Sequence, residues 1–385
     1  MSIYFDHAAT TPISDSALTA LTNQAKKLGN ASSLHSAGRS VRKDLEAARE
    51  EIAKAIDCAP SEVIFTATGT EANNLAIKGL YWKAIKEGKN LIITSTFEHH
   101  AVMDPILWLA EHEGAKVIEI DVDKSGMVDL DKIKQVVIDN KGKIAFISIM
   151  HSNNEVGTLQ DIAQIVKVAG DIPVHSDCVQ SFGKVELSFK ELGLTAATIS
   201  AHKIGGPLGV AALILKRGLD IEPILHGGGQ ERDIRSGTFN APSILAFAAA
   251  ATESASQFKE RSVVVRKLKQ SLIEMVKKNV SDAWVNGDQT NSLPGIVSIT
   301  FPKSDSEGLL LLLDSEGIAC STGSACSAGV QRPSHVLLAM GLSEDETTST
   351  LRFSLSHSNT IAEIEKLGAV IASVVERSRA ASGKK

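Results

Sequence analysis

Lys203 is the residue of this sequence whose position best suits covalent chemistry. It follows an apolar run over residues 197–201, which predicts a buried strand, and it precedes the pair Gly205-Gly206. Desolvation at such a strand end disfavours the ammonium form and lowers the pKa of a lysine. An amine made less basic in this way can form a Schiff base with an aldehyde. A surface lysine at a turn would have the same local sequence, so the surrounding motifs must distinguish the two interpretations.

Four polar clusters follow other predicted strands, all before Lys203. Ligands of open α/β sheets bind beyond the carboxyl ends of the strands, where such clusters lie. A strand-end histidine or aspartate is often only a cap, so each cluster alone is weak. Together they offer a phosphate cradle at a helix N-terminus, an aromatic ring, a carboxylate and an amine, the set that pyridoxal 5'-phosphate requires. The clusters are Gly69-Thr70-Glu71, Glu98-His99-His100, His151 to Glu155, and His175 to Gln180.

The cysteines suggest a second reactive group. Cys58, Cys178, Cys320 and Cys326 are too few and too scattered for a disulfide framework, and without a C-x-x-C pair we expect no structural zinc site. Cys326 lies among small residues over 320–329, a composition that permits close backbone approach and predicts a loop presenting a thiol. Whether that thiol reacts depends on its environment.

The composition is that of an ordinary soluble protein. The chain has 385 residues, of which 43% are hydrophobic and 22% charged, enough for two to three domains' worth of core. A net charge of -5 argues against direct nucleic-acid binding. No apolar run approaches a membrane span, and the first seven residues lack the pattern of a secretory signal. We therefore expect a cytoplasmic protein without a membrane partner.

The predicted elements divide the chain into two parts. Strands alternate with helices over the first two-thirds, which predicts a mostly parallel sheet covered by helices on both faces. After about residue 255 a long charged helix over 256–279 leads into a different pattern, typical of a smaller α+β domain. We expect a large α/β domain over 14–255 and a small domain formed by 1–13 and 256–385. The predicted strands cover 63–66, 91–95, 117–121, 144–150, 172–174, 210–215, 296–301 and 350–355.

A series of short motifs extends over nearly the whole chain. They are Tyr4-Phe-Asp-His-Ala-Ala-Thr-Thr-Pro12, Gly29-Asn-Ala-Ser-Ser33, Thr68-Gly-Thr-Glu71, Asn153-Asn-Glu-Val-Gly157, Gly227-Gly-Gly-Gln-Glu-Arg232, Arg235-Ser-Gly-Thr238, Gly323-Ser-Ala-Cys326 and Leu351-Arg-Phe-Ser-Leu355. In this order they resemble the NifS/IscS-like cysteine desulfurases of the class-V aminotransferases. The resemblance implies a pyridoxal-phosphate-dependent transferase fold, aspartate-aminotransferase-like (fold type I), with a mostly parallel central sheet and a smaller α+β domain.

The resemblance also implies how the cofactor would be held. Lys203 resembles the lysine that bonds the cofactor and later moves the proton of the substrate Cα. Asp177 would pair with the pyridinium nitrogen, and Gln180 would donate to the phenolic oxygen. His99 would stack on the ring and exchange protons. The phosphate would be bound by Gly69, Thr70, Ser200 and His202, with Thr238 reaching it from the partner subunit of a homodimer.

The remaining roles concern substrate and sulfur. Arg352 would bind the α-carboxylate of L-cysteine with bidentate geometry, and Asn154 would contact cofactor or substrate. Cys326 resembles the nucleophile that takes the sulfur as a persulfide and leaves alanine. The spacing from Cys326 to His335 resembles the long-loop group, which implies direct delivery to an acceptor protein, an iron–sulfur scaffold or a tRNA-thiolation protein. No metal ligand is implied.

Two alternatives remain open at this point. A selenocysteine or cysteine-sulfinate lyase of the same fold would need Cys326 less, and an interaction protein without catalysis would need none of Lys203, Asp177 and Cys326. Cys178 stands where the family often has alanine, which favours a small buried residue behind the cofactor. Cys320 could accept a persulfide or be an inert thiol at a strand end.

Overall fold

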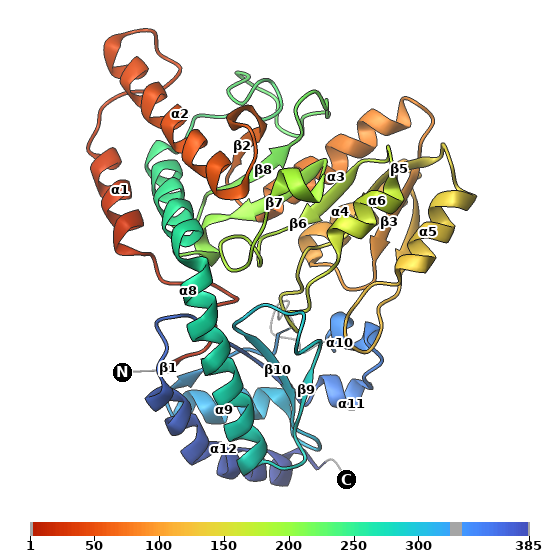
Figure 1. The fold of residues 1–385 in the computed structure, drawn as a ribbon, viewed down its shortest axis with the longest axis vertical. Coiled ribbons are helices and arrows are strands. Elements are labelled where there is room, and N and C mark those ends of the chain that lie inside the picture. The colour runs from red at the N-terminus through yellow and green to blue at the C-terminus, as the bar shows by residue number, and fades with distance from the viewer. Residues whose placement is uncertain (1–2, 324–332, 384–385) are drawn as a thin grey trace.

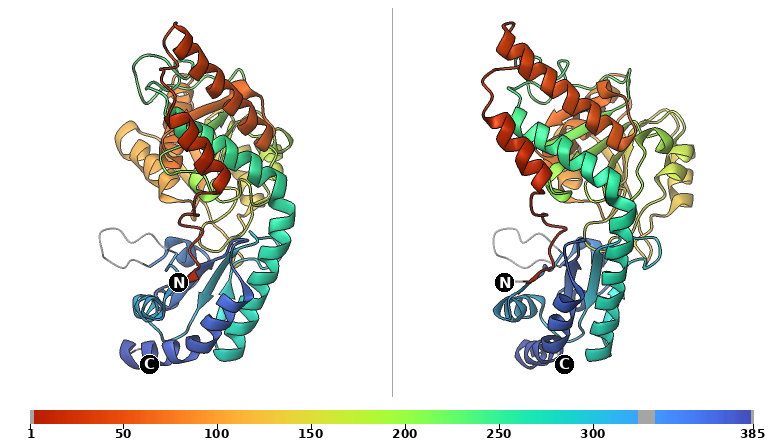
Figure 2. Two further views of the ribbon diagram at one scale, coloured as in Figure 1. Left: turned by 90° about the vertical axis from the view of Figure 1, so that its left-hand side faces the viewer. Right: turned by 60° about the vertical axis from the view of Figure 1, so that its left-hand side comes forward.

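The computed structural model describes residues 3–323 and 333–383. Two parts lie one above the other in Figure 1, a larger one built on a wide sheet and a smaller one near both chain ends. Figure 2 shows the long helix α8 (Ala241–Asn279) extending along one side of both parts. The molecule is therefore organised around two sheets and one helix that connects them.

Within the described residues, seven strands form the larger sheet, in the order β2-β8-β7-β6-β5-β3-β4. In this sheet, only β8 runs against its neighbours. It pairs antiparallel with β2 and β7, and the other pairings are parallel. The sheet is thus mostly parallel, as the sequence predicts. The bounds are β2 Val63–Thr66, β3 Leu91–Ser95, β4 Lys116–Ile120, β5 Ile144–Ser148, β6 Val174–Asp177, β7 Ala196–Ser200 and β8 Ala211–Leu215.

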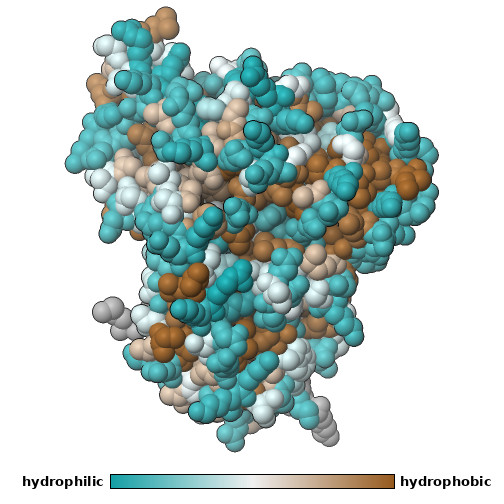
Figure 3. Space-filling model, in the orientation of Figure 1, coloured by the Kyte–Doolittle hydropathy of each residue, from teal (hydrophilic) through white to brown (hydrophobic). Residues whose placement is uncertain are grey.

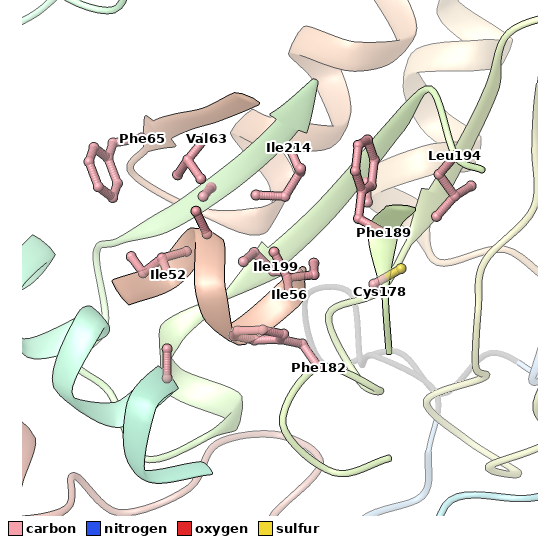
Figure 4. Packing of buried hydrophobic residues seen from close by; sticks show 14 of the residues in the cluster. Ile52, Ile56, Val63, Phe65, Cys178, Phe182, Phe189, Leu194, Ile199 and Ile214 are labelled. Carbon is pink, nitrogen blue, oxygen red and sulfur yellow. The ribbon is translucent and has the colours of Figure 1, made fainter. Parts of the chain in front are cut away.

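Helices cover both faces of this sheet because successive strand residues point to opposite sides. Ile64, Ile92 and Leu213 pack with α3 and α4, whereas their neighbours Phe65 and Ile214 pack with α2 and α8. Figure 4 shows Ile52 and Ile56 of α2 against Val63, Ile199 and Ile214. The helices of this part are α1 Asp15–Ala25, α2 Ser36–Ile56, α3 Gly69–Ile85, α4 His100–Glu113, α5 Leu130–Asp139, α6 Ile162–Ala169 and α7 Phe189–Leu192, with short 3-10 turns at Pro60–Glu62 and Ala201–Lys203.

The smaller part combines both ends of the chain. Among the described residues, β10 pairs antiparallel with β9 and β12, and β1 pairs in parallel with β11, so the first residues join the C-terminal region. An apolar cluster of its own fills this part. The elements are β1 Ile3–Tyr4, β9 Trp284–Asn286, β10 Ile296–Thr300, α9 Ser306–Ser315, β11 Ile318–Ala319, α10 His335–Ala339, α11 Glu344–Thr347, β12 Thr350–Ser354 and α12 Ile361–Ser382.

Two sequence predictions differ from the structure. The helix expected over 256–279 begins at Ala241, because its alanine-rich first turns are buried against α1 and α2 and carry none of the charges on which the prediction rested. The strand expected over 172–174 is β6, Val174–Asp177, whose polar residues are buried. A division between residues 255 and 256 falls inside the continuous helix α8, and the two-domain boundaries stay a prediction.

Figure 3 shows hydrophilic residues over much of one face, with apolar residues gathered in several groups, the largest at the upper right of the view. Across the described ranges, no helix combines the length and apolar character needed to cross a membrane.

Candidate active site

One cavity of about 1430 Å³ gathers most of the predicted site residues. Asp177 ends β6 and Ser200 ends β7, so these two lie at the carboxyl edge of the parallel strands, where ligands of open α/β sheets bind. Arg352 reaches the same cavity from β12 of the smaller part. The predicted residues that line it are Gly69, Thr70, His99, Asn154, Asp177, Gln180, Ser200, His202, Lys203 and Arg352.

Two predicted residues are not among those that line the cavity. Thr238 is exposed, between the turn at residues 231–235 and the start of α8. The role predicted for Thr238 is in the cavity of a partner subunit. A residue with that role must be exposed on its own subunit, as Thr238 is. Cys326 lies outside the described residues. Gly323 and Pro333, the described residues that flank its segment in the sequence, both line the cavity.

Lys203 ends a short 3-10 turn directly after β7 and directs its amine into the cavity. Its Nζ donates hydrogen bonds to the carbonyl oxygens of Ala8, at 2.6 Å, and Ala9, at 2.7 Å. Desolvation by burial lowers the pKa of Lys203 to about 8, and the nearby charge of Arg352 acts in the same direction. A neutral amine is therefore accessible close to neutral pH, as the sequence position predicts.

Asp177 is held in place by two donors. Its Oδ2 accepts a hydrogen bond from Asn73 Nδ2 at 2.8 Å, and its Oδ1 accepts one from Val179 N at 2.9 Å. The residue is only 6% exposed. A carboxylate oriented this way at a cavity wall is suited to bind a protonated ring nitrogen through a charge-assisted hydrogen bond.

His99 caps α4 and faces the cavity. Its Nδ1 accepts a hydrogen bond from Ala101 N at 3.0 Å, so a neutral ring carries its proton on Nε2. Desolvation lowers the pKa of His99, and the charge of Lys203 lowers it as well, while Asp177 opposes both. The result is a mostly neutral imidazole near neutral pH, which offers a flat face for stacking and one N–H for proton exchange.

The N-terminus of α3 forms an anion cradle with β7. The first N–H groups of a helix have no carbonyl partner within it and carry the positive end of the helix dipole. A Cβ on Gly69 would lie only 3.2 Å from Val179 Cγ2, so the glycine lets the helix begin close to Val179, with Ser200 beside it. Desolvation lowers the pKa of His202 to about 4, which keeps its ring neutral. Main-chain N–H groups, a hydroxyl and a neutral imidazole suit a phosphate monoester.

Arg352 lies in the middle of β12 and is 5% exposed. Its Nη2 donates to Asp6 Oδ1 at 2.8 Å, and its Nη1 donates to the carbonyl oxygen of Asn154 at 2.9 Å. A guanidinium has five N–H donors, and its buried Nε has no acceptor among the described residues. The remaining donors give Arg352 the capacity to bind a carboxylate that enters the cavity.

The described cysteines all remain protonated at neutral pH. Burial raises the pKa of Cys58, Cys178 and Cys320 to about 12 in each case. Cys178 packs in the apolar cluster near Phe182 and Leu194, as expected for a small buried residue (Figure 4). Cys320 lines the cavity, but its thiol has little thiolate character.

Sequence reasoning assigned no role to three contributors to the site. Asp6 lies inside the motif Tyr4 to Pro12 and Asn73 lies two residues after the motif Thr68 to Glu71, but their partners Arg352 and Asp177 are distant in the chain. A polar Asn73 between the buried residues Ala72 and Leu75 was the available signal for the second. Lys184, which bonds to Gln180, stands only four residues after it, a spacing that could have suggested the contact.

Comparison with known proteins identifies the family of this chain. A family model described as aminotransferase class-V matches residues 3–367. An "IscS-like cysteine desulfurase" of Mycobacterium tuberculosis is 44% identical over 384 residues, which are 98% of each chain. The chain belongs to the class-V aminotransferase family. This confirms the predicted family.

Solved structures of class-V aminotransferase relatives agree with the fold. A "NifS-like protein" superposes with a TM-score of 0.91 at 33% identity, covering 98% of this chain and all of that one. A structure titled "SspA in complex with cysteine" gives a TM-score of 0.81 at 32% identity and covers 93% of this class-V aminotransferase. The predicted fold class is thereby confirmed.

Proposed function

We propose that this protein is a pyridoxal-phosphate-dependent cysteine desulfurase that converts L-cysteine to L-alanine and passes the sulfur on from Cys326. The observation that carries the proposal is one cavity lined by Lys203, Asp177, His99 and Arg352, with Gly323 and Pro333 at the same walls. The full-length similarity to proteins named cysteine desulfurases supports the same activity.

The side chains of the cavity fit pyridoxal phosphate. The start of α3 with Ser200 and His202 suits its phosphate, Asp177 suits its ring nitrogen, and the amine of Lys203 suits its aldehyde. Gln180, Asn154 and Thr70 line the same walls and would complete the binding site. The bound cofactor would supply a conjugated ring that accepts the electrons released at the substrate Cα.

The residues of this chain would bind and orient the substrate. Arg352 would hold the α-carboxylate of L-cysteine with the N–H groups that Asp6 and Asn154 leave available. The amine of Lys203, with its pKa lowered to about 8, would take the Cα proton as a general base. His99, neutral and with its proton on Nε2, would give or accept a proton at the reacting group.

The sulfur step balances with Cys326 as the nucleophile. Its thiolate would form an S–S bond to the substrate sulfur while the Cβ–S bond breaks. The electron pair of that bond stays with Cβ, which takes up a proton and becomes the methyl group of alanine, while Lys203 would return the proton that it took from Cα. The enzyme is left with a persulfide on Cys326.

We further propose that the sulfur acceptor is another protein, an iron–sulfur scaffold or a tRNA-thiolation protein, and that the enzyme is a cytoplasmic homodimer. Support comes from the family resemblance, in which Thr238 of one subunit reaches the phosphate site of the other. The exposure of Thr238 is compatible with that arrangement.

The experiment that tests the function compares three variants of the purified protein. Lys203→Ala is expected to lose the visible absorption of bound pyridoxal phosphate. Cys326→Ser is expected to keep that absorption and to lose both alanine release and the added mass of one sulfur atom on its peptide. Cys320→Ser is the matched control and should keep all three properties, because the Cys320 thiol is protonated.

Three outcomes would favour one of the alternative functions. Undiminished sulfur release by Cys326→Ser, or faster alanine release from selenocysteine than from cysteine, would favour a lyase. Purified protein without a cofactor band would favour an interaction protein. Incubation with isotope-labelled cysteine followed by candidate acceptors identifies the recipient of the sulfur.

A further inference from the structure

A second lysine, Lys184, reaches the candidate active site from behind Lys203. Lys184 and Lys203 both line a smaller cavity of about 90 Å³, together with His7 and Ala8. Ala8 and Lys203 line the large cavity as well, so these two residues lie between the two spaces. Lys184 therefore faces the site from the side opposite the predicted cofactor.

Lys184 determines the orientation of the Gln180 amide. The Nζ of Lys184 donates to Gln180 Oε1 at 3.2 Å, and Gln180 Nε2 donates to the carbonyl oxygen of Ala8 at 2.9 Å. An ammonium has donors only, so a flipped amide would bring its NH₂ against the NH₃⁺ and lose both bonds. The same Ala8 oxygen accepts from Lys203 Nζ at 2.6 Å. One chain of hydrogen bonds thus connects Lys184 to Lys203 through Gln180.

Within residues 3–323 and 333–383, the charge of Lys184 has no counter-ion nearby. In the part of the chain that the structure describes, no carboxylate lies within ion-pair distance of its Nζ. Desolvation, with the charges of Lys203 and Arg352, lowers the pKa of Lys184 to about 7. Bound pyridoxal phosphate would add negative charge to the site and favour the ammonium form. The charged and titratable groups that face Lys184 or share its cavity are Lys203, Arg352, His7, His202, Arg261 and His357.

We propose that Lys184 is a positioning residue, which fixes Gln180 as a donor toward the cofactor and so stabilises the deprotonated form of the bound cofactor. The inference rests on the proposed function, in which Gln180 donates to the phenolic oxygen of pyridoxal phosphate. A positive charge behind that donor strengthens its N–H and favours negative charge on the oxygen that accepts it.

The test is a pH titration of the visible absorption band of the holoenzyme. Lys184→Met is expected to raise the midpoint of the titration by about one unit, because a nearby positive charge that favoured the deprotonated form is gone. Lys184→Arg keeps the charge and should stay close to the wild-type midpoint. Lys184→Gln also removes the charge but keeps a polar side chain, and it replaces Lys184→Met in the test if that variant does not fold.

A double-mutant comparison tests whether Lys184 acts through Gln180. In a Gln180→Leu background, Lys184→Met is expected to shift the midpoint by less than half of its effect in the wild type. Lys269→Met is the matched control: Lys269 is 6% exposed and donates to Ser292 Oγ at 3.0 Å, and it lines neither cavity. Its loss should leave the titration unchanged.

The possible results distinguish a failure of this inference from a failure of the proposed function on which it rests. An unchanged midpoint in folded, cofactor-loaded Lys184→Met and Lys184→Gln overturns the role of Lys184. An equal shift with and without Gln180 overturns the positioning route. A wild-type protein that binds no pyridoxal phosphate contradicts the proposed function itself.

Discussion

Arg352 and Asp6 form an ion pair in the smaller part of the molecule, with 2.8 Å between Nη2 and Oδ1, although they are 346 positions apart in the chain. The pair connects β12 of the C-terminal region to the segment after β1, which also supplies the carbonyl oxygens of Ala8 and Ala9 to Lys203. Ala8 and Ala9 therefore line the candidate active site, and together with Asp6 they hold both of its central cations in place.

Asp6→Asn should weaken substrate binding more than it weakens chemistry. Without the carboxylate, Arg352 loses its fixed orientation, and we expect kcat/KM for L-cysteine to fall about tenfold, mainly through KM. Steady-state alanine release measures this, and the cofactor band should be unchanged. Arg352→Lys, which loses the forked geometry, should cost about 100-fold. A fall confined to kcat would argue against a carboxylate site at Arg352.

The reaction of the apoprotein with pyridoxal phosphate should follow the titration of Lys203. The neutral amine is the reactive form, and the pKa of Lys203 is lowered to about 8, so the rate should rise with pH through that region. Arg352→Gln removes a charge that lowers this pKa and should move the midpoint to higher pH. Initial rates of colour formation measure both, with a lysine amide in solution as the control for titration of the cofactor. A midpoint that moves downward in Arg352→Gln would contradict the assignment.

Asn73→Ala should weaken cofactor binding by releasing Asp177. The loss of the 2.8 Å hydrogen bond from Nδ2 leaves Asp177 with Val179 N as its described donor, and we expect the Kd for pyridoxal phosphate to rise about tenfold. Asn74→Ala is the matched control, since Asn74 bonds only to the carbonyl oxygen of Thr70 in the same helix. Equal losses in both variants, measured by absorbance titration, would show a general effect on α3.

Glu98 should make the protein less stable as the pH rises. Burial raises the pKa of Glu98 to about 8, although its Oε1 accepts from Ser95 Oγ and Met150 N. Between the usual carboxyl pKa and about 8, the unfolded chain has released a proton that the folded protein retains, so folding stability falls with pH across that window.

Glu98→Gln removes this titration while keeping the acceptor at Oε1. We expect an increase in Tm of about 2–4 °C at pH 8, with little change near pH 4, where wild-type Glu98 is protonated in both states. Thermal unfolding of the two proteins at both pH values measures the difference. An equal shift at the two pH values would show that the effect is one of packing and not of charge.

The sheet could be predicted from sequence because its strands are short and almost wholly apolar. Strand β3 occupies the predicted 91–95, and β2 the predicted 63–66. Only the start of β6 could be predicted from hydropathy, since His175 and Ser176 are polar and are buried with hydrogen-bond partners on or next to β5. His175 Nδ1 lies 2.9 Å from Ser148 Oγ, and Ser176 Oγ donates to the carbonyl oxygen of Ile149.

The motif residues that themselves face the cavity could be predicted from the sequence. The residues that hold them in place could be predicted less well. Lys203, Asp177 and Arg352 come from motifs that become recognisable once they are taken together in their order along the chain. Their supports Ala8, Asn73 and Asp6 act through a backbone carbonyl or through pairs separated by more than a hundred residues, which only the fold brings together.

The high pKa of the three described thiols has a consequence for the fate of the sulfur. Cys58, Cys178 and Cys320 hold their protons, and a protonated thiol does not attack a sulfur–sulfur bond. Cys320 would therefore not attack a persulfide formed on Cys326 to give a disulfide between the two residues, even though Cys320 lines the cavity. Burial of the neighbouring thiols would therefore leave the persulfide sulfur for the external acceptor that we propose.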